Sequence, residues 1–479
     1  MTFASLNIMP VLPEIVLAVM ACVILLIDPF MPKSGRTVSY LLSLATLVVL
    51  FVLTLIGMDD SVRLSFSDMV VNDPMSDLMK LVIYVIAFAV FILARGYLRD
   101  RGIDKGEYYT LGLFGVLGMM IMISANHLLL VYLGLELMSL AMYAMVAFKR
   151  DDSRASEAAM KYFVLGALAS GLLLYGMSML YGATGTLYIT EIGAAAAQDS
   201  SNLVLKLGLV FILVGLVFKL GAAPFHMWLP DVYDGAPTAV TLYLAAAPKV
   251  AGLAVLIRML VEGLGPMFSD WQPMLVVVAV LSLLVGNLIA IAQTSFKRML
   301  TYSTISHVGF ILMGLLAGTH EGYGAALFYT VAYAIMTLGG FGMIVLLARQ
   351  GFEADQLDDL KGLNDRSPVM AFVFLILMFS MAGIPFTLGF WAKLAVLQAV
   401  VQIDMTWLAV FAVVMSVIGA FYYLRAVKLA YFDKPEGEQR IAAGGEVRVV
   451  LGISGLFVAA MGLYPSWFIA MSNGVFIVQ

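Results

Sequence analysis

The sequence lacks most of the residues from which metal, redox and nucleic-acid sites are built. Cys22 is its only cysteine, which excludes disulfide bonds, iron–sulfur clusters and thiolate zinc sites formed within this chain. Charged residues make up only 12% and the formal net charge is −4, whereas nucleic-acid binding requires a concentrated basic face. We find no nucleotide-binding loop, metal cluster or nucleophile–base pair in the sequence. We therefore expect no catalytic redox centre in this chain.

Apolar residues are abundant instead. They make up 62% of the 479 residues, and the mean hydropathy is +0.99. A soluble domain of this size would expose much of that apolar surface to water. The apolar runs are continuous, which is typical of membrane helices and not of the alternating strands of a membrane β-barrel. The sequence therefore predicts an all-α polytopic membrane protein.

The apolar runs predict about 14 transmembrane helices, since one span requires roughly 20 predominantly apolar residues. The seventh span is followed by a partly apolar re-entrant stretch, and the twelfth is long and interrupted. The expected spans are approximately 11–27, 38–57, 75–94, 108–125, 127–148, 157–182, 203–222, 238–261, 274–293, 300–318, 323–348, 369–400, 406–431 and 449–471.

Lysine and arginine are distributed unevenly between the expected loops. The loops after the odd-numbered spans hold 19 of the 27 basic residues. The other side has only four in or near its loops, Arg63, Lys80, Lys206 and Arg258. Basic loops stay on the cytoplasmic side of a membrane. We therefore expect a multi-pass protein of a bacterial inner (plasma) membrane with both termini in the periplasm.

Five ionisable residues fall inside the expected spans, away from their ends. They are Glu136, Lys219, Lys249, His307 and Lys393. A charge at the bilayer centre costs at least ~2.5–3.5 kcal/mol on insertion scales, so such residues usually face a protein-lined or wet interior. Burial disfavours the charged form of a lysine and a neighbouring carboxylate favours it, while the histidine reference pKa is already near neutrality.

These residues predict a proton relay at mid-membrane depth. We expect Glu136 and Lys219 to form a switchable pair, and Lys249, His307 and Lys393 to continue the path. Lys161 lies one turn into the sixth span, four residues after Glu157, in the favourable order for a helical ion pair. It is therefore either a further relay residue or paired for structure. A purely structural subunit, with buried charges that serve assembly, is the corresponding alternative for the whole set.

Two of the expected spans are interrupted beside a lysine, by Gly221 and Pro224 in the seventh and by Gly383 and Pro385 in the twelfth. Non-helical backbone at membrane depth is tolerated only where protein or water satisfies it, so we expect a hydrated cavity at each break. The two broken spans run in opposite directions, which indicates inverted-topology repeats. The predicted divisions are an N-terminal three-helix segment (1–106), a first repeat of spans 4–8 (107–263), a second repeat of spans 9–13 (264–432), and a linker with span 14 (433–479).

Four separated motifs resemble those of one protein family. They are "LGLELMSLAMYAM", "FKLGAAPFHMWLPDVYDGAPTAVT", "KRMLTYSTISHVGF" and "MAGIPFTLGFWAKL". In their order, over roughly residues 107–430, they resemble the antiporter-like membrane subunits of respiratory complex I, which are proton-conducting membrane transporters. The length of the chain and a lysine at position 393 favour one particular member of this family.

The resemblance implies a proton-translocating membrane-arm subunit of NADH:quinone oxidoreductase. It implies that the path residues are Glu136, Lys219, Lys249 and Lys393, with Lys161 and His307 at further matching positions. It also implies that this chain binds no cofactor, and that NAD, FMN, iron–sulfur clusters and quinone belong to partner subunits. The expected partners are the other membrane and peripheral subunits of the complex, together with lipid, protons and internal water.

Two alternatives belong to other assemblies or classes. A subunit of a multisubunit cation/proton antiporter would share the same motifs. A di-haem cytochrome would need paired histidines on facing helices at matched depth, but the chain has only four histidines. His226 and His320 fall in expected loops and His127 begins the fifth span, which leaves His307 without an evident partner.

Overall fold

The computed structural model is almost wholly helical. It describes residues 7–31, 36–435, 441 and 444–476. Within these ranges, thirteen helices are long and apolar enough to cross a membrane, and two shorter apolar helices, Pro368–Ala382 and Leu388–Gln402, lie where the twelfth span was expected. The prediction of an all-α polytopic membrane protein is therefore confirmed.

The elements follow the predicted spans closely. The spanning helices are α1 (Leu12–Ile27), α2 (Arg36–Gly57), α3 (Pro74–Asp100), α4 (Gly106–Ile123), α5 (Leu128–Val146), α6 (Ser153–Thr184), α8 (Leu203–Leu220), α10 (Thr238–Leu256, followed by a π-helical segment Ile257–Gly263), α11 (Phe268–Ile291), α12 (Phe296–Leu316), α13 (His320–Leu347), α17 (Thr406–Phe432) and α18 (Gly445–Leu463). The shorter elements are β1 (Arg63–Ser65), β2 (Val70–Asn72), α7 (Ile189–Gln198), α9 (Trp228–Gly235), α14 (Leu363–Arg366), α15 (Pro368–Ala382), α16 (Leu388–Gln402) and α19 (Ser466–Gly474). His320, expected in a loop, is the first residue of α13.

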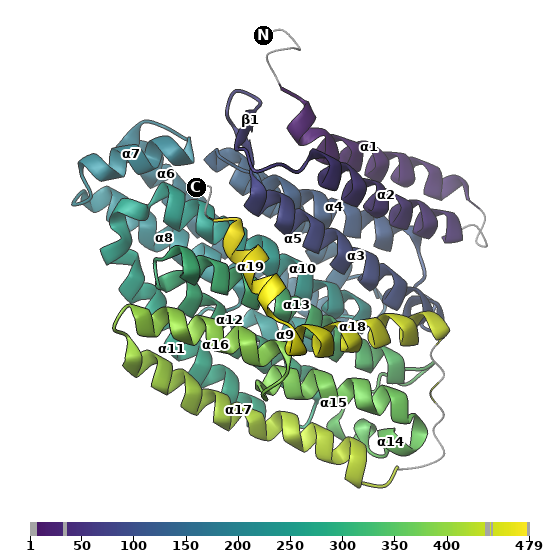
Figure 1. The fold of residues 1–479 in the computed structure, drawn as a ribbon. Helices are drawn as coiled ribbons and strands as arrows, with labels where there is room; N and C mark the ends of the chain where they lie inside the picture. The colour runs from purple at the N-terminus through teal and green to yellow at the C-terminus, as the bar shows by residue number, and fades with distance from the viewer. Residues whose placement is uncertain (1–6, 32–35, 436–440, 442–443, 477–479) are drawn as a thin grey trace.

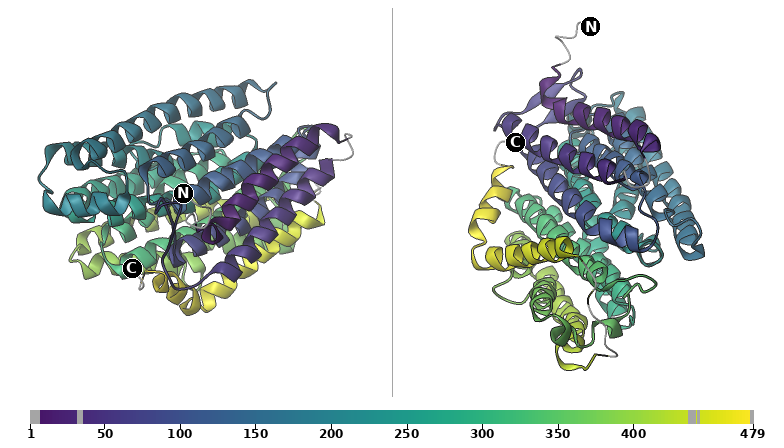
Figure 2. Two further views of the ribbon diagram at one scale, coloured as in Figure 1. Left: turned by 90° about the horizontal axis from the view of Figure 1, so that it is seen from above. Right: turned by 90° about the vertical axis from the view of Figure 1, so that its right-hand side faces the viewer.

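The helices pack side by side into one bundle (Figure 1). α1, α2 and α3 lie along one edge, α11 and α17 lie along the opposite edge, and α18 and α19 cross the front (Figure 1). The right-hand view of Figure 2 likewise has the purple N-terminal helices and the green helices near residue 400 at opposite ends of the bundle. In the central helices α10, α12 and α13, about nine-tenths of the residues in the apolar stretch are buried. Lys249 of α10 and His307 of α12 are therefore surrounded by protein.

The loops separate onto two faces of the bundle. On one face, backbone hydrogen bonds join the loops after spans 2, 4 and 6: Val71 N donates to Ser124 O (2.8 Å), Asn126 N to Met69 O (2.9 Å), and Ile189 N to Asn126 O (3.0 Å). On the other face, the loops after spans 3, 5, 7, 9 and 11 line one charged pocket. The basic loops on which the orientation depends therefore share a face. Lys33, Arg440 and part of the expected linker 433–448 lie outside the described residues.

Two buried ion pairs fasten the N-terminal three helices. Lys80 of α3 lies 2.6 Å from Glu14 of α1, and Arg258 lies 2.7 Å from Asp73, the residue that caps α3. Glu14, near the start of the first span, is buried, and so are Lys80 and Arg258, which the sequence placed in or near loops. Helix packing excludes water from both ion pairs. Each buried charge is tolerated because the opposite charge of its partner lies beside it.

Candidate functional site

The first helix break lies between α8 and α9, as the sequence predicts. α8 ends at Leu220, and Gly221 follows with a left-handed backbone (φ 75°), which favours glycine. The carbonyl of Leu220 has no partner within its helix, and it accepts a hydrogen bond from Lys249 Nζ at 2.7 Å. The backbone carbonyl of Phe218, two residues earlier, accepts from Trp228 Nε1 at 3.0 Å. Side chains from α9 and α10 therefore satisfy the exposed end of α8.

Lys249 is enclosed by protein. It is 2% exposed and follows Pro248 within α10. Its Nζ lies 5.7 Å from the Trp228 ring and 6.0 Å from the Tyr233 ring, distances at which an aromatic face attracts a cation. No carboxylate of the described chain forms an ion pair with it. Lys249 is therefore held by a carbonyl and by aromatic faces.

The second break repeats this arrangement. α15 ends at Ala382, and Gly383 follows with a left-handed backbone (φ 85°). Lys393 Nζ donates to the carbonyl of Ala382 at 2.8 Å and to Ser416 Oγ at 2.8 Å, and the Phe310 ring lies 5.1 Å away. In both breaks a buried lysine binds the carbonyl of the residue just before the left-handed glycine. The structural counterpart of Lys393 is therefore Lys249, and not Lys219.

Lys219 lies close to the first break but points to α5. Its Nζ donates to Ser139 Oγ at 2.9 Å and lies 3.5 Å from Tyr143 OH. Glu136 is on the same face of α5 as these residues, three and seven positions earlier. Glu136 and Lys219 do not form an ion pair within 4 Å here, and Glu136 Oε1 is buried with no hydrogen-bond partner in the described chain. The expected switchable pair stays a prediction, with Ser139 between its members.

His307 is the centre of a buried hydrogen-bonded network. Its Nδ1 lies 2.7 Å from Tyr329 OH and its Nε2 lies 3.0 Å from Tyr423 OH. Tyr423 OH also contacts Ser303 Oγ. Phe310, one turn along α12, stacks on Tyr329 and faces Lys393. The network thus approaches Lys393 without a direct hydrogen bond to it among the described residues.

The structure adds hydroxyl groups that the sequence argument missed. They are Ser139, Tyr143, Tyr329, Ser416 and Tyr423. For two of them a signal was available, because Ser139 and Tyr143 share a helical face with Glu136. For the others nothing in the local sequence distinguishes a buried tyrosine or serine that binds a relay residue from one that only packs. No protein hydrogen bond within the described chain joins Lys249 to His307.

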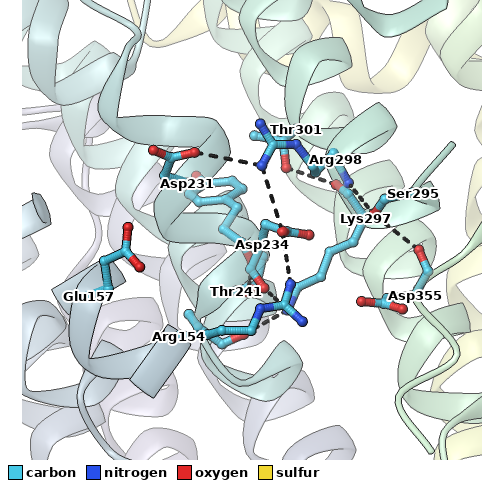
Figure 3. Close-up of polar contacts among 12 residues, drawn as sticks. Arg154, Glu157, Asp231, Asp234, Thr241, Ser295, Lys297, Arg298, Thr301 and Asp355 are labelled. Carbon is cyan, nitrogen blue, oxygen red and sulfur yellow. Dashed lines mark hydrogen bonds and ion pairs between the residues drawn. The ribbon is translucent and has the colours of Figure 1, made fainter. Parts of the chain in front are cut away.

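Lys161 lies apart from the buried residues. Its side chain is 43% exposed and forms ion pairs with Glu157 and with Asp231 of α9, both at 2.8 Å. Asp231 also lies 3.6 Å from Arg298. The helical pair with Glu157 forms as its spacing suggests. Lys161 therefore joins the surface charges that hold α9, as Figure 3 shows for several of their members.

A charged pocket of about 440 Å³ lies beside α9. Asp234 accepts from Arg154 at 3.1 Å (Figure 3). Lys297 is buried in the wall of the pocket and donates to the carbonyl of Ala236 at 2.6 Å. Glu353 accepts from the hydroxyl of Tyr97 at 2.6 Å, from Thr238 Oγ1 at 2.5 Å and from Arg101 at 2.5 Å.

From this pocket a line of polar groups follows α10 toward Lys249. Thr241 Oγ1 donates to the carbonyl of Tyr233 at 2.8 Å. Tyr233 OH donates to the carbonyl of Leu244 at 3.1 Å. Pro248 has no N–H to bond that carbonyl within the helix. The Tyr233 ring in turn faces Lys249.

A comparison with protein-family models identifies the class of protein. The model described as "NADH:quinone oxidoreductase/Mrp antiporter, TM" matches residues 125–419. The chain belongs to this family of transmembrane proteins, and the expected family is confirmed. Within the described residues, no group of three or more histidine, cysteine, aspartate or glutamate side chains could hold a metal ion.

Individual relatives are similar over nearly the whole chain. NADH-quinone oxidoreductase subunit N of Thioalkalivibrio sulfidiphilus is 60% identical over 99% of both chains. A chain in respiratory complex I from Thermus thermophilus with bound aureothin is 30% identical, with a TM-score of 0.83 over 95% of this chain and 98% of that one. A chain in the Mrp complex from Dietzia sp. DQ12-45-1b has a TM-score of 0.88 at 21% identity, over 98% and 97% of the chains, and shares the fold.

The glycines at the breaks generate a stability prediction. A Cβ on Gly221 would lie 2.1 Å from Leu229 Cδ1, and one on Gly383 would lie 2.8 Å from Lys393 Cδ. Gly185 has the same left-handed backbone with nothing within 4 Å. We expect Gly185→Ala to cost only the backbone strain of about 1–2 kcal/mol. Gly221→Ala and Gly383→Ala should lower the midpoint of thermal unfolding in detergent further, and equal losses in all three variants would contradict this account of the breaks.

Glu353 generates a pH prediction. Burial raises its pKa, but the charges of Lys297 and Arg101 and the hydrogen bonds outweigh burial and hold the pKa of Glu353 below its usual 4.5. A lowered folded-state pKa stabilises the protein above the unfolded value, and this stabilisation is lost as the pH falls through the folded value.

We therefore expect Glu353→Gln to cost about 1–3 kcal/mol at pH 7. Its difference from the wild type should stay constant down to about pH 4.5 and narrow below that. The measurement is the unfolding midpoint against pH, with Glu321→Gln at an exposed position as the control. A difference that narrows already between pH 7 and pH 6 would contradict the lowered pKa.

Proposed function

We propose that this chain is a proton-translocating membrane subunit of an NADH:quinone oxidoreductase. One observation carries the proposal: Lys249 and Lys393 bind the free carbonyl groups of two broken helices, with no carboxylate partner in the described chain. Burial disfavours the charged form of each lysine, while the carbonyl and the negative end of the helix dipole favour it by up to about 2 kcal/mol. Because these effects oppose each other, a change in the surroundings of either lysine can shift the balance between its charged and its neutral form.

The proposed path uses the residues that the structure clusters around the breaks. Lys219 directly precedes Leu220, whose carbonyl Lys249 binds, and water would carry a proton between the two ammonium groups. Glu136 lies one turn from Ser139, which binds Lys219. His307, between two tyrosine hydroxyls, and then Lys393 would complete the relay, with water molecules bridging the gaps. Hydrated cavities at the two breaks belong to this proposal.

The charged pocket beside α9 supports the proposal from the aqueous side. It has ionisable groups at its wall and a line of polar groups that leads from Thr241 through Tyr233 to the surroundings of Lys249. The pocket lies on the face of the bundle that carries most of the basic loops. We therefore assign that face to the cytoplasm. Both termini then lie in the periplasm of a bacterial inner membrane.

The proposed partners follow from the relatives. Relatives at more than half identity are subunits N of NADH-quinone oxidoreductases, and similar solved chains lie in respiratory complex I. We propose that neighbouring subunits hold NAD, FMN, iron–sulfur clusters and quinone, and that their redox chemistry drives proton movement here. A cation/proton antiporter subunit is the second candidate, favoured by the similar fold of the Mrp chain.

Arginine substitutions separate proton transfer from structure. Lys249→Arg and Lys393→Arg retain a charge and hydrogen-bond donors for the carbonyl groups, but arginine does not release its proton in proteins. We expect assembly to persist and NADH-driven proton uptake into proteoliposomes to fall severalfold. The matched control is Lys206→Arg. The Lys206 side chain is 40% exposed and forms an ion pair with Asp270. Full proton uptake in the first two variants would support a purely structural role for these lysines.

Co-purification distinguishes the two candidate assemblies. A tagged chain extracted in mild detergent should bring NADH–quinone activity together with flavin and iron–sulfur spectra. Recovery with other membrane subunits, but without redox spectra, would overturn the complex I assignment in favour of the cation/proton antiporter. The arginine variants should co-purify with the same flavin and iron–sulfur spectra as the wild type, because their surfaces are unchanged.

A further inference from the structure

Side chains of α3, α13, α18 and α19 line an apolar groove. Figure 1 shows where these helices lie in the bundle. The volume of the groove is about 650 Å³, and a hollow of about 190 Å³ between α2 and α3 shares Phe51, Val85 and Phe88 with it. Among the described residues that line the groove, Ser454 and Trp467 have polar side-chain atoms, and the Ser454 hydroxyl already donates to the carbonyl of Val450 at 3.0 Å. The rest of the lining is apolar and suits a hydrocarbon chain.

The groove lies at membrane depth and is about one leaflet long. On α3 it extends from Leu81 to Ile92, which is about 16 Å at a rise of 1.5 Å per residue. Half of a hydrocarbon core of roughly 30 Å is about 15 Å. The groove thus has the length of one acyl chain.

Arginines lie beyond one end of the groove, at the depth of lipid headgroups. Arg95 is on the next turn of α3 after Ile92, and Arg448 directly precedes the lining residue Val449 in α18. Arg95 Nη1 is 3.9 Å from Glu446, and its Nε is buried without a hydrogen-bond partner in the described chain. Arg448 is exposed and donates to a backbone carbonyl, that of Ile441, at 3.3 Å. Arg448 therefore retains donors that suit a phosphate. Arg95 Nη2 already donates to Thr37 Oγ1 at 3.3 Å and its guanidinium lies 4.4 Å from the Tyr40 ring, so Arg95 contributes mainly positive charge at this end of the groove.

A whole transmembrane helix does not fit inside the groove. A helix about 10 Å across and 16 Å long occupies about 1,250 Å³, roughly twice the space available. We propose that the groove binds an anionic glycerophospholipid, with one acyl chain between α3 and α18 and its phosphate at Arg95 and Arg448. Such a lipid would join the C-terminal helices to the N-terminal three-helix segment. This site is independent of the proposed proton path.

Photo-crosslinking of the assembled protein tests the proposal. The purified complex is reconstituted into phosphatidylcholine vesicles that contain a minor fraction of phosphatidylglycerol with a diazirine in its acyl chain. A second sample has the same diazirine on phosphatidylcholine. Mass spectrometry then compares labelled α3 and α18 peptides with labelled α17 peptides around Val417, a lipid-facing reference that is 69% exposed.

We expect phosphatidylglycerol to label α3 and α18 more than phosphatidylcholine does, with no such preference at α17. Arg95→Gln and Arg448→Gln should each lower that preference about fivefold, whereas Lys428→Gln on α17 should not change it. Ile453→Trp, which fills the groove, should lower labelling by both lipids. Equal labelling of the groove and α17 by both lipids would overturn the proposal in favour of unselective boundary lipid. Labelling of α17 alone would overturn it in favour of a protein neighbour over the groove.

Discussion

The contact between a lysine ammonium group and the last carbonyl of a broken helix is the interaction on which the interior depends. A helix that stops inside a membrane leaves carbonyl groups without partners in the helix, and each costs several kcal/mol if it stays unsatisfied. Lys249 supplies a donor at the end of α8, and Lys393 does so at the end of α15. Each lysine is equally in need of a partner, because a charge buried alone is costly. One short hydrogen bond therefore satisfies both the free carbonyl group and the buried ammonium group.

The same contact explains why each break occurs together with a buried lysine. A continuous helix would leave Lys249 and Lys393 without an acceptor, and a break without a lysine would leave the carbonyls free. Left-handed glycines allow the close approach, since the space where a Cβ would lie is filled by Leu229 in one case and by Lys393 in the other. The correspondence between the two breaks therefore resides in what each lysine binds. The two lysines differ in position: Lys249 lies on the next spanning helix, α10, whereas Lys393 lies on α16, the second half of the broken span.

The remaining polar groups divide according to depth. In the interior, hydroxyl groups of serine and tyrosine contact Lys219, His307 and Lys393, so that the polar groups form a chain of neutral partners beside each ionisable one. At one face, carboxylates and arginines around α9 form ion pairs that are partly exposed. This difference is expected, because water screens exposed pairs, whereas in the interior hydrogen bonding to fixed groups replaces hydration.

The sequence by itself determined the class of fold, the approximate limits of the spans, the two breaks and five ionisable residues that lie within the spans. These follow from local physics: the length of an apolar run, the backbone preferences of glycine and proline, and the cost of a charge in hydrocarbon. Only the tertiary structure decided what each buried group binds. It turned Lys219 toward Ser139, placed Lys161 among exposed ion pairs, and buried Glu14 against Lys80. Partners from different helices depend on how those helices cross and rotate, which the spacing of residues along one helix does not specify.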